Sequence, residues 1–198
     1  MALPVKIEEV GVESLQRYAE IPIAFDVESV LRVELVNDGL GGILLEEERV
    51  HPPYRKDYDA LDGGPAKWPD RFDISNWGIL LAMQEGQAVG GAAVAADIPM
   101  GMNMVEASPD RAVLYDIRVR PEHRGSGIGG YLFQEAVDWA RSRGCRLLKV
   151  ETQNTNVSAC RFYASQGCKL GAINRHAYAS SPATKDDVML LWFLELRP

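Results

Sequence analysis

The fold is decided by one stretch of the chain, residues 116–130, which has the sequence DIRVRPEHRGSGIGG. Its first residues end an apolar run that begins at Ala112 and has the composition of a β-strand. From Gly129 to Arg143, apolar residues recur at the spacing of a helix. The glycine-rich turn Arg124–Gly130 therefore joins a strand directly to a helix.

Glycines in such a turn let the backbone approach a ligand closely, and the N–H groups of a helix N-terminus favour a phosphate or pyrophosphate. A tight turn without a ligand is the alternative interpretation. A P-loop does not fit, because it needs a lysine that this turn lacks. A dinucleotide-binding fingerprint could begin with Gly125 and Gly127, but the polar residues 120–124 separate these glycines from the strand, unlike in a Rossmann turn.

The rest of the chain alternates between strand and helix patterns. A β-hairpin is predicted from the apolar runs 78–84 and 88–96, and residues 52–77 are predicted as a long polar connection of the kind that is usually functional or mobile. Helices follow the two central strands, so we predict an α/β protein with a mixed sheet. The other predicted elements are strands over 27–36, 147–152, 170–178 and 188–196 and a helix over 157–166.

The composition is that of one globular domain of 198 residues, with 46% hydrophobic residues. The net charge of -7 argues against a nucleic-acid-binding protein. No apolar run approaches the ~18 residues of a spanning helix and no signal peptide is visible, so we expect no membrane association. Three cysteines without a C-x-x-C pair are typical of buried thiols in a reducing compartment, which makes the cytoplasm the expected location.

The charge is unevenly distributed along the chain. Residues 20–62 hold eleven acidic and four basic side chains, a net of -7, whereas residues 111–161 hold nine basic and five acidic ones, a net of +4. This arrangement would suit a cationic ligand that meets an anionic one. The alternative is ordinary solvated surface charge.

Two segments resemble the acetyl-CoA motifs of the GNAT N-acetyltransferases. Residues 116–121 followed by Arg124-x-x-Gly127-x-Gly129 are similar to the family's strand and pyrophosphate loop. Residues 156–167 resemble the second motif, Asn-x-x-Ala-x-x-Phe-Tyr-x-x-x-Gly, with Cys168 where phenylalanine is usual. Shorter matches at residues 25–27, 53–58 and 151–153 look like the streptothricin acetyltransferase branch, whose members modify an antibiotic amine.

The resemblance implies a GNAT fold. This is an α/β fold whose mixed, mostly antiparallel central sheet is flanked by helices, with strands 112–119 and 147–152 splayed apart. It also implies a single acetyltransferase domain over residues 1–198. In that domain, residues 1–77 would form the acceptor side and residues 78–198 the acetyl-CoA-binding core.

The co-substrate implied by the resemblance is acetyl-CoA. Backbone N–H groups of the strand would hold the pantetheine arm and polarise the thioester, the glycine loop would hold the pyrophosphate, and Asn156 would touch the arm. No metal is expected, because His51, His123 and His176 have no ligand spacing. The implied acetyl-CoA-binding residues are Ile117, Arg118, Val119, Arg124, Gly125, Ser126, Gly127, Ile128, Gly129, Gly130, Asn156 and Tyr163.

Proton transfer has two candidate residues. Tyr163 resembles the family's general acid, which protonates the departing thiolate, and a core tyrosine is the alternative. Asp116 could take the proton from the amine, directly or through a water, or could be a structural or substrate-orienting carboxylate. Other candidate bases, if the first strands line the amine pocket, are Asp26, Glu28 and Glu34.

The acceptor is expected to be a cationic amine. Several aromatic and acidic side chains of residues 54–77 could hold one through cation–π attraction and charge pairing. A loop anchored by aromatic residues and carrying solvated acids would have the same composition. The implied acceptor-binding residues are Asp26, Glu28, Tyr54, Asp57 and Tyr58.

These observations predict an acetyl-CoA-dependent N-acetyltransferase. It would transfer acetyl to a primary amine of a small cationic acceptor, such as a streptothricin-like antibiotic, by direct attack in a ternary complex, and so confer antibiotic resistance. The family resemblance also leads us to expect a homodimer. The alternatives are a catalytically silent domain that binds or senses acyl-CoA, and a transferase for protein N-termini or lysines.

Overall fold

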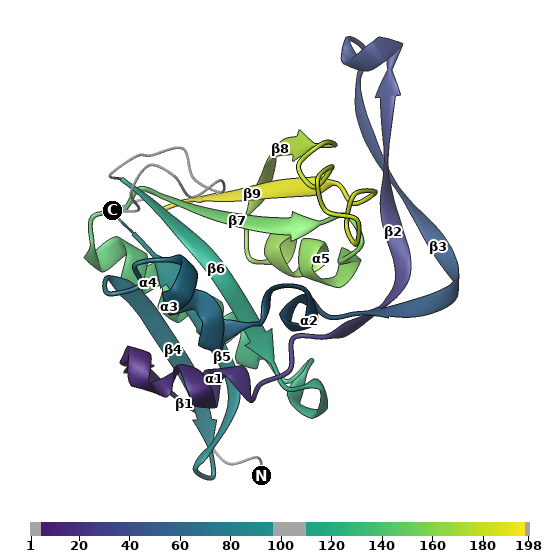
Figure 1. Cartoon of the computed structure of the whole chain (residues 1–198). Coiled ribbons are helices and arrows are strands. Elements are labelled where there is room, and N and C mark those ends of the chain that lie inside the picture. Colours follow the sequence, from purple (N-terminus) through teal and green to yellow (C-terminus); the bar gives the residue numbers. More distant parts are fainter. Residues whose placement is uncertain (1–4, 97–109, 197–198) are drawn as a thin grey trace. The chain divides into compact units, whose positions relative to one another are not determined.

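The computed structural model describes residues 5–96 and 110–196, which form two compact units (Figure 1). Unit 1 comprises Met1–Ile23, Asp57–Val150 and Phe193–Pro198, and unit 2 comprises Ala24–Lys56 and Glu151–Trp192. These boundaries do not coincide with the predicted division at residue 77, which stays a prediction about function.

Unit 1 is built on a sheet with the strand order β1-β4-β5-β6-β7. Its strands are antiparallel to their neighbours except β6 and β7, which are parallel, so the predicted mixed sheet is confirmed. The predicted hairpin and the strand after it are also confirmed, whereas β1 was not predicted. The strands are β1 (Lys6–Val10), β4 (Trp77–Gln84), β5 (Gln87–Ala95), β6 (Arg111–Val119) and β7 (Leu147–Gln153), which continues into unit 2.

Both faces of this sheet are covered, which explains why β4 and β5 are almost continuously apolar and buried. Helix α4 (Ile128–Ser142) packs on one face, where a Cβ at Gly90 would lie 2.9 Å from Leu132 Cδ1. On the other face, a Cβ at Gly91 would lie 2.5 Å from the ring of Tyr18 in α1 (Leu15–Ala19). Adjacent glycines thus let a helix approach the sheet from each side.

The pairing between β6 and β7 ends halfway along β6. It runs from Arg111 opposite Leu147 to Leu114 opposite Val150, while β6 itself continues to Val119. The predicted splaying of these two strands requires such an end to the ladder. On its other edge β6 pairs with β5, and a register shift leaves Tyr115 as an extra residue, a β-bulge.

Unit 2 contains a long hairpin and the strand order β7-β9-β8. The hairpin consists of β2 (Phe25–Val36) and β3 (Gly42–Lys56), and it is followed in the chain by α2 (Tyr58–Asp62) and α3 (Trp68–Arg71) of unit 1. The prediction of one long connection over 52–77 was therefore wrong. The remaining elements of unit 2 are α5 (Val157–Ser165) and β8 (Lys169–Asn174), which ends earlier than predicted. Strand β9 (Met189–Glu195) begins in unit 2, and its residues from Phe193 onward belong to unit 1.

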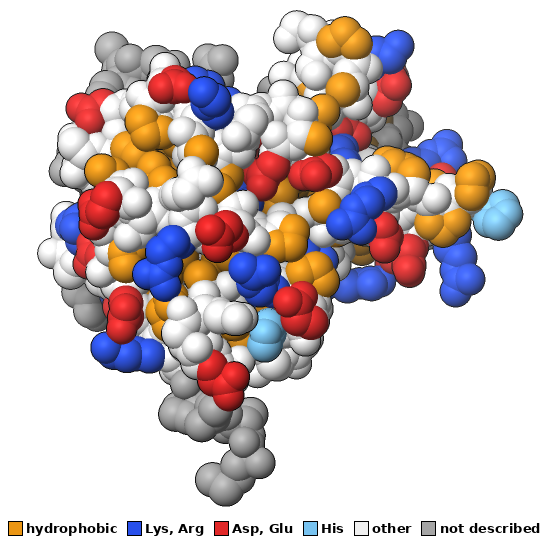
Figure 2. All heavy atoms as spheres, turned by 60° about the horizontal axis from the view of Figure 1, so that its bottom comes forward, with side chains coloured by type: hydrophobic (Ala, Val, Ile, Leu, Met, Phe, Trp, Pro, Cys, Tyr) orange, Lys and Arg blue, Asp and Glu red, His pale blue; other side chains and the backbone are white. Residues whose placement is uncertain are grey.

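Charged side chains of both signs are interspersed on the face shown in Figure 2. Several acids of the hairpin also have basic partners: Arg32 contacts Glu48 at 2.8 Å and Glu34 at 3.4 Å, and Arg161 pairs with Glu47. The acidic excess of residues 20–62 is thus partly neutralised within unit 2. No helix in the described part of the chain is long and apolar enough to span a membrane.

The three cysteines, Cys145, Cys160 and Cys168, are buried and not disulfide-bonded, as predicted. Burial raises the pKa of the Cys160 thiol, and it raises the pKa of Cys168 to about 11. The Cys160 and Cys168 thiols are therefore protonated at neutral pH and poorly nucleophilic.

Candidate functional site

The glycine loop before α4 has the backbone conformation of an anion-binding turn. Gly125 and Gly127 have φ values of +76° and +92°, which are strained for other residues. A Cβ at Gly125 would meet nothing within 4 Å, and one at Gly127 would meet only Tyr131, at 3.9 Å. Gly127 is the N-cap of α4 and provides no side-chain cap, so the N–H groups of the first turn suit a phosphate.

Side chains of the loop brace its backbone. The Ser126 hydroxyl donates to the His123 carbonyl at 2.6 Å, and Arg124 Nε donates to the Val119 carbonyl at 3.0 Å. The Arg124 side chain is therefore turned back onto the end of β6. This geometry favours a role for Arg124 through its backbone rather than as a counter-ion.

Strand β6 leads directly into this loop. Ile117 and Val119 pair with Ala92 and Gly90 of β5 on one edge, whereas the ladder on the other edge ends at Leu114. An edge that extends beyond its neighbouring strand can bind an extended molecule through backbone hydrogen bonds. The predicted site for the pantetheine arm coincides with this edge.

Asp116 belongs to a buried charge cluster in unit 1. Its carboxylate accepts hydrogen bonds from the Tyr18 hydroxyl at 2.7 Å and from Arg118 Nε and Nη2 at 2.8 and 2.7 Å. Arg118 also donates to both oxygens of Asp59, at 2.7 and 3.1 Å, and to the Ile21 carbonyl at 3.0 Å. The Arg118 side chain is 1% exposed and the Asp116 side chain 8% exposed.

This cluster bears on the two interpretations of Asp116. Burial alone would lower the pKa of Arg118, but the charge of Asp116 and the hydrogen bonds to Asp116 and Asp59 outweigh it and raise the pKa. Both oxygens of Asp116 accept hydrogen bonds within the cluster, from Arg118 and from Tyr18. The geometry thus favours the structural or orienting role, and the role of general base for Asp116 stays an untested prediction.

In unit 2, the second predicted motif forms helix α5. The Asn156 side chain caps this helix by accepting hydrogen bonds from the Ala159 N–H at 3.1 Å and the Ser158 hydroxyl at 3.0 Å. Tyr163 is 5% exposed, and its ring makes an edge contact with Phe162. The motif thus has a local structural role, besides the contacts to acetyl-CoA that the sequence predicts.

The predicted acceptor residues are divided between the units. Asp26 and Glu28 of β2 and Tyr54 of β3 lie on the hairpin, where Asp26 is opposite Arg55 and Val27 opposite Tyr54. Burial, and then the charge of Asp187, raise the pKa of Tyr54.

The other two predicted acceptor residues lie in unit 1. Asp57 caps α2 by accepting from the Asp59 N–H at 3.1 Å, and Tyr58 begins that helix. Asp59 also accepts hydrogen bonds from Arg118. A test that changes Asp57 and Asp59 together would therefore disturb both the helix cap and the charge cluster.

The structure reveals two polar pairs that the sequence did not predict, both in unit 2. The Tyr178 hydroxyl donates to Glu151 Oε1 at 2.5 Å, and the buried Lys56 ammonium pairs with Asp187. Glu151 directly follows Val150, the last residue of β7 paired with β6. The partners are 27 and 131 residues apart in sequence, so no local pattern reveals them.

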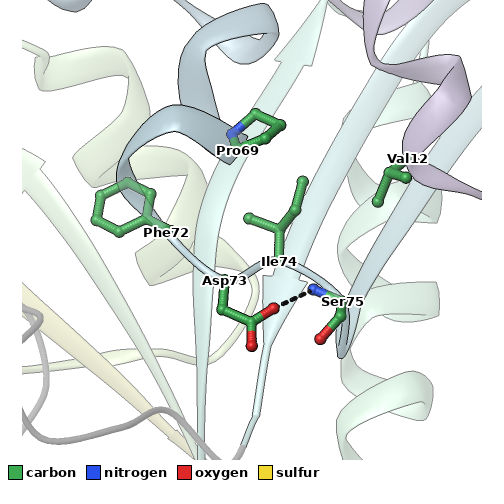
Figure 3. Close-up of a pocket in the computed structure, with 6 residues that line it drawn as sticks. All are labelled: Val12, Pro69, Phe72, Asp73, Ile74 and Ser75. Carbon is green, nitrogen blue, oxygen red and sulfur yellow. Dashed lines mark hydrogen bonds between the residues drawn. The ribbon is translucent and has the colours of Figure 1, made fainter.

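One surface hollow of about 360 Å³ lies in unit 1, away from every predicted site residue in sequence (Figure 3). Hydrogen bonds from the Ser75 side chain and backbone lower the pKa of its one acid, Asp73. A lone carboxylate engaged in a turn gives this hollow no convergent chemistry. Its lining residues are Val12, Pro69, Phe72, Asp73, Ile74 and Ser75. Within residues 5–96 and 110–196, no group of three or more His, Cys, Asp or Glu residues could hold a metal ion.

The sequence of residues 44–168 matches the acetyltransferase (GNAT) family. The chain belongs to this family. Streptothricin acetyltransferase of Escherichia coli is 29% identical over 141 residues, which cover 71% of this chain and 70% of that protein. The homologue of the same name from Streptomyces lavendulae is 26% identical over 174 residues, which cover 85% and 83%. Streptothricin acetyltransferase A of Bacillus subtilis (strain 168) is 34% identical, but over only 82 residues, 41% of this chain and about half (47%) of that protein.

Solved structures support the same assignment. A protein assigned as a streptothricin acetyltransferase of Bacillus anthracis str. Ames, in complex with acetyl coenzyme A, has a TM-score of 0.75 and 26% identity, and the match covers 97% of this chain and 99% of that one. Nourseothricin acetyltransferase shares the fold, with a TM-score of 0.76, 24% identity and coverage of 98% and 100%. The predicted GNAT fold and the prediction of an acetyl-CoA-dependent N-acetyltransferase are therefore confirmed.

Proposed function

We propose that this acetyltransferase transfers the acetyl group of acetyl-CoA to a primary amine of a small polycationic acceptor of the streptothricin type. The observation that carries the proposal is the positive-φ glycine loop at the N-terminus of α4, which follows a strand whose outer edge extends beyond its ladder. The choice of acceptor is supported by the streptothricin acetyltransferases among the relatives.

The acetyl-CoA roles are those that the sequence predicts. Backbone groups of Ile117, Arg118 and Val119 on β6 hold the pantetheine arm and polarise the thioester carbonyl. The loop Arg124–Gly130 holds the pyrophosphate, and Asn156 contacts the arm. In a ternary complex the amine nitrogen bonds to the acetyl carbon, the carbon–sulfur bond breaks, and Tyr163 gives a proton to the departing thiolate.

The amine must lose a proton before or during this attack, and we assign the base to Glu151 rather than Asp116. The donors on Asp116 include the guanidinium of Arg118, which engages both of its oxygens in a buried cluster. Glu151 Oε1 accepts a hydrogen bond from the Tyr178 hydroxyl, and the residue is half-buried, with Oε2 in the buried part of its side chain. Tyr178 thereby orients one oxygen of Glu151.

Glu151→Gln should lower kcat by about 100-fold at neutral pH, because glutamine keeps the shape of the side chain but cannot take up the proton. The deficit should shrink as the pH is raised toward the pKa of the acceptor amine, since a neutral amine needs no base. Steady-state kinetics across pH measure both effects. A deficit that does not change with pH would exclude Glu151 as the base.

The proposed acceptor can be tested by CoA release. Wild-type protein is mixed with acetyl-CoA and, in separate reactions, streptothricin, small polyamines, an arylamine and a peptide with a free N-terminus. We expect turnover with streptothricin and a KM that rises with ionic strength, because salt screens the attraction of a polycation. An arylamine should show no such salt dependence.

The same panel distinguishes the alternatives. Binding of acetyl-CoA without turnover of any amine would indicate a sensing domain. Preferential turnover of the peptide would indicate a protein N-terminal acetyltransferase. A preference for arylamines, or a KM for streptothricin that does not respond to salt, would contradict a polycationic acceptor.

A further inference from the structure

Each end of the short segment Lys56–Asp59 takes part in a buried charge cluster. The catalytic roles given above include neither the Lys56 nor the Asp59 side chain. Lys56 is the last residue of β3 in unit 2, whereas Asp59 lies in the first turn of α2 in unit 1. Between them are Asp57 and Tyr58, two of the predicted acceptor-binding residues. The clusters therefore flank the point where the chain passes from one unit to the other.

The first cluster fixes Lys56 within unit 2. Its side chain is 9% exposed, and its ammonium donates to the Asp187 carboxylate and, at 3.0 Å, to the Thr155 hydroxyl. Thr155 precedes Asn156, the cap of α5, and Asp187 precedes β9. One ammonium group thus ties the end of the hairpin to two other segments of the same unit.

The second cluster fixes Asp59 within unit 1. Two nitrogens of Arg118 donate to the two carboxylate oxygens of Asp59, a paired arrangement that sets the orientation of the acid as well as its distance. Arg118 is itself held by Asp116. The first turn of α2 is therefore attached to β6, the strand that leads into the glycine loop.

Stability alone is a weak explanation for these two clusters. Taking charges out of water costs so much that well-packed apolar residues of similar volume often stabilise a fold equally well or better. What a buried ion pair adds is a defined geometry. With each end fixed within its own unit, Asp57 and Tyr58 have fewer conformations to lose when the acceptor binds, which lowers the entropic cost of binding it.

We propose that Lys56 and Arg118 are positioning residues that hold the two ends of the segment 56–59 and so preorganise Asp57 and Tyr58 for the acceptor amine. The inference rests on the proposed function, since it takes this segment to be part of the acceptor site. It assigns no chemical step to either residue.

Two variants test the two ends separately. Asp59→Asn weakens the interaction of Arg118 with the first turn of α2. Lys56→Met combined with Asp187→Asn removes the other ion pair and both of its charges. Each should raise the KM for the amine by about 10-fold and leave the KM for acetyl-CoA within about 2-fold of wild type. Each should also speed backbone hydrogen exchange in residues 54–62 but not in α4.

The control is Val137→Ala, a buried change in α4 that lowers the melting temperature without touching either cluster. It should leave the KM for the amine unchanged. Faster exchange throughout the molecule, with equal losses for both substrates, would show a merely structural role and overturn the proposal. So would an unchanged KM for the amine in both variants. Wild-type turnover is measured first, so its absence refutes the proposed function before any variant is assayed.

Discussion

Replacing Tyr163 with phenylalanine should lower kcat by about 100-fold while leaving the affinity for acetyl-CoA nearly unchanged. The substitution removes the hydroxyl proposed to protonate the departing thiolate. It keeps the ring, which is buried at 5% exposure and contacts Phe162, so helix α5 should stay intact. Steady-state assays of CoA release give kcat. Calorimetric titration gives the affinity for acetyl-CoA separately.

The melting temperature of this variant is the control for folding. A normal kcat in a folded Tyr163→Phe protein would mean that the tyrosine is a core residue with no catalytic role. A loss of acetyl-CoA affinity equal to the loss of kcat would assign the hydroxyl to binding instead of proton transfer.

Replacing Gly127 with valine should weaken acetyl-CoA binding by about 100-fold or more, because the branched side chain would occupy the space in which the pyrophosphate meets the backbone. That space is open in the structure, since a Cβ at this position meets only Tyr131, at 3.9 Å. Valine is also strained at the φ of +92° that Gly127 adopts. Calorimetric titration with acetyl-CoA measures the loss.

Gly144→Val is the matched control, because it separates strain from ligand contact. Gly144 follows the other end of α4, has a φ of +75°, and would place its Cβ in open space. It should cost similar stability and leave acetyl-CoA affinity intact. If both variants bind acetyl-CoA alike, the pyrophosphate does not lie on the loop.

The regions that sequence predicted well are those in which local pattern determines structure. The hairpin β4–β5, the strand β6, helix α4 and helix α5 lie within a few residues of their predicted bounds, because apolar spacing and glycine turns act over a few residues. Strand β3 was not predicted, and its last residues, 52–56, were assigned to the polar connection, where Pro52 and Pro53 interrupt a strand pattern. Its pairing with β2 overrides that local signal.

The site was predicted in its motifs but not in its charge network. Nothing in the local sequence distinguishes Asp116, bound by Arg118 and Tyr18, from a carboxylate open to the amine. The bulge at Tyr115 likewise has no sequence signature, although it explains how Tyr115 and Asp116, adjacent in the strand, both contact residues on the same face of the sheet.

Each unit is formed by stretches of the chain that are separated by stretches of the other unit, and this has a consequence for synthesis on the ribosome. The hairpin Ala24–Lys56 is made early, but its partners Asn154 and Asp187 are made late: Leu31 bonds to the Asn154 carbonyl at 2.9 Å, and Lys56 precedes Asp187 by 131 residues. At typical elongation speeds this interval is roughly 7–26 s. During that time the hairpin lacks the hydrogen bond to Asn154 and the ion pair with Asp187 that hold it in unit 2. Over that interval the exposed apolar side chains of the hairpin, Leu35, Ile43 and Leu44, are open to non-native contacts.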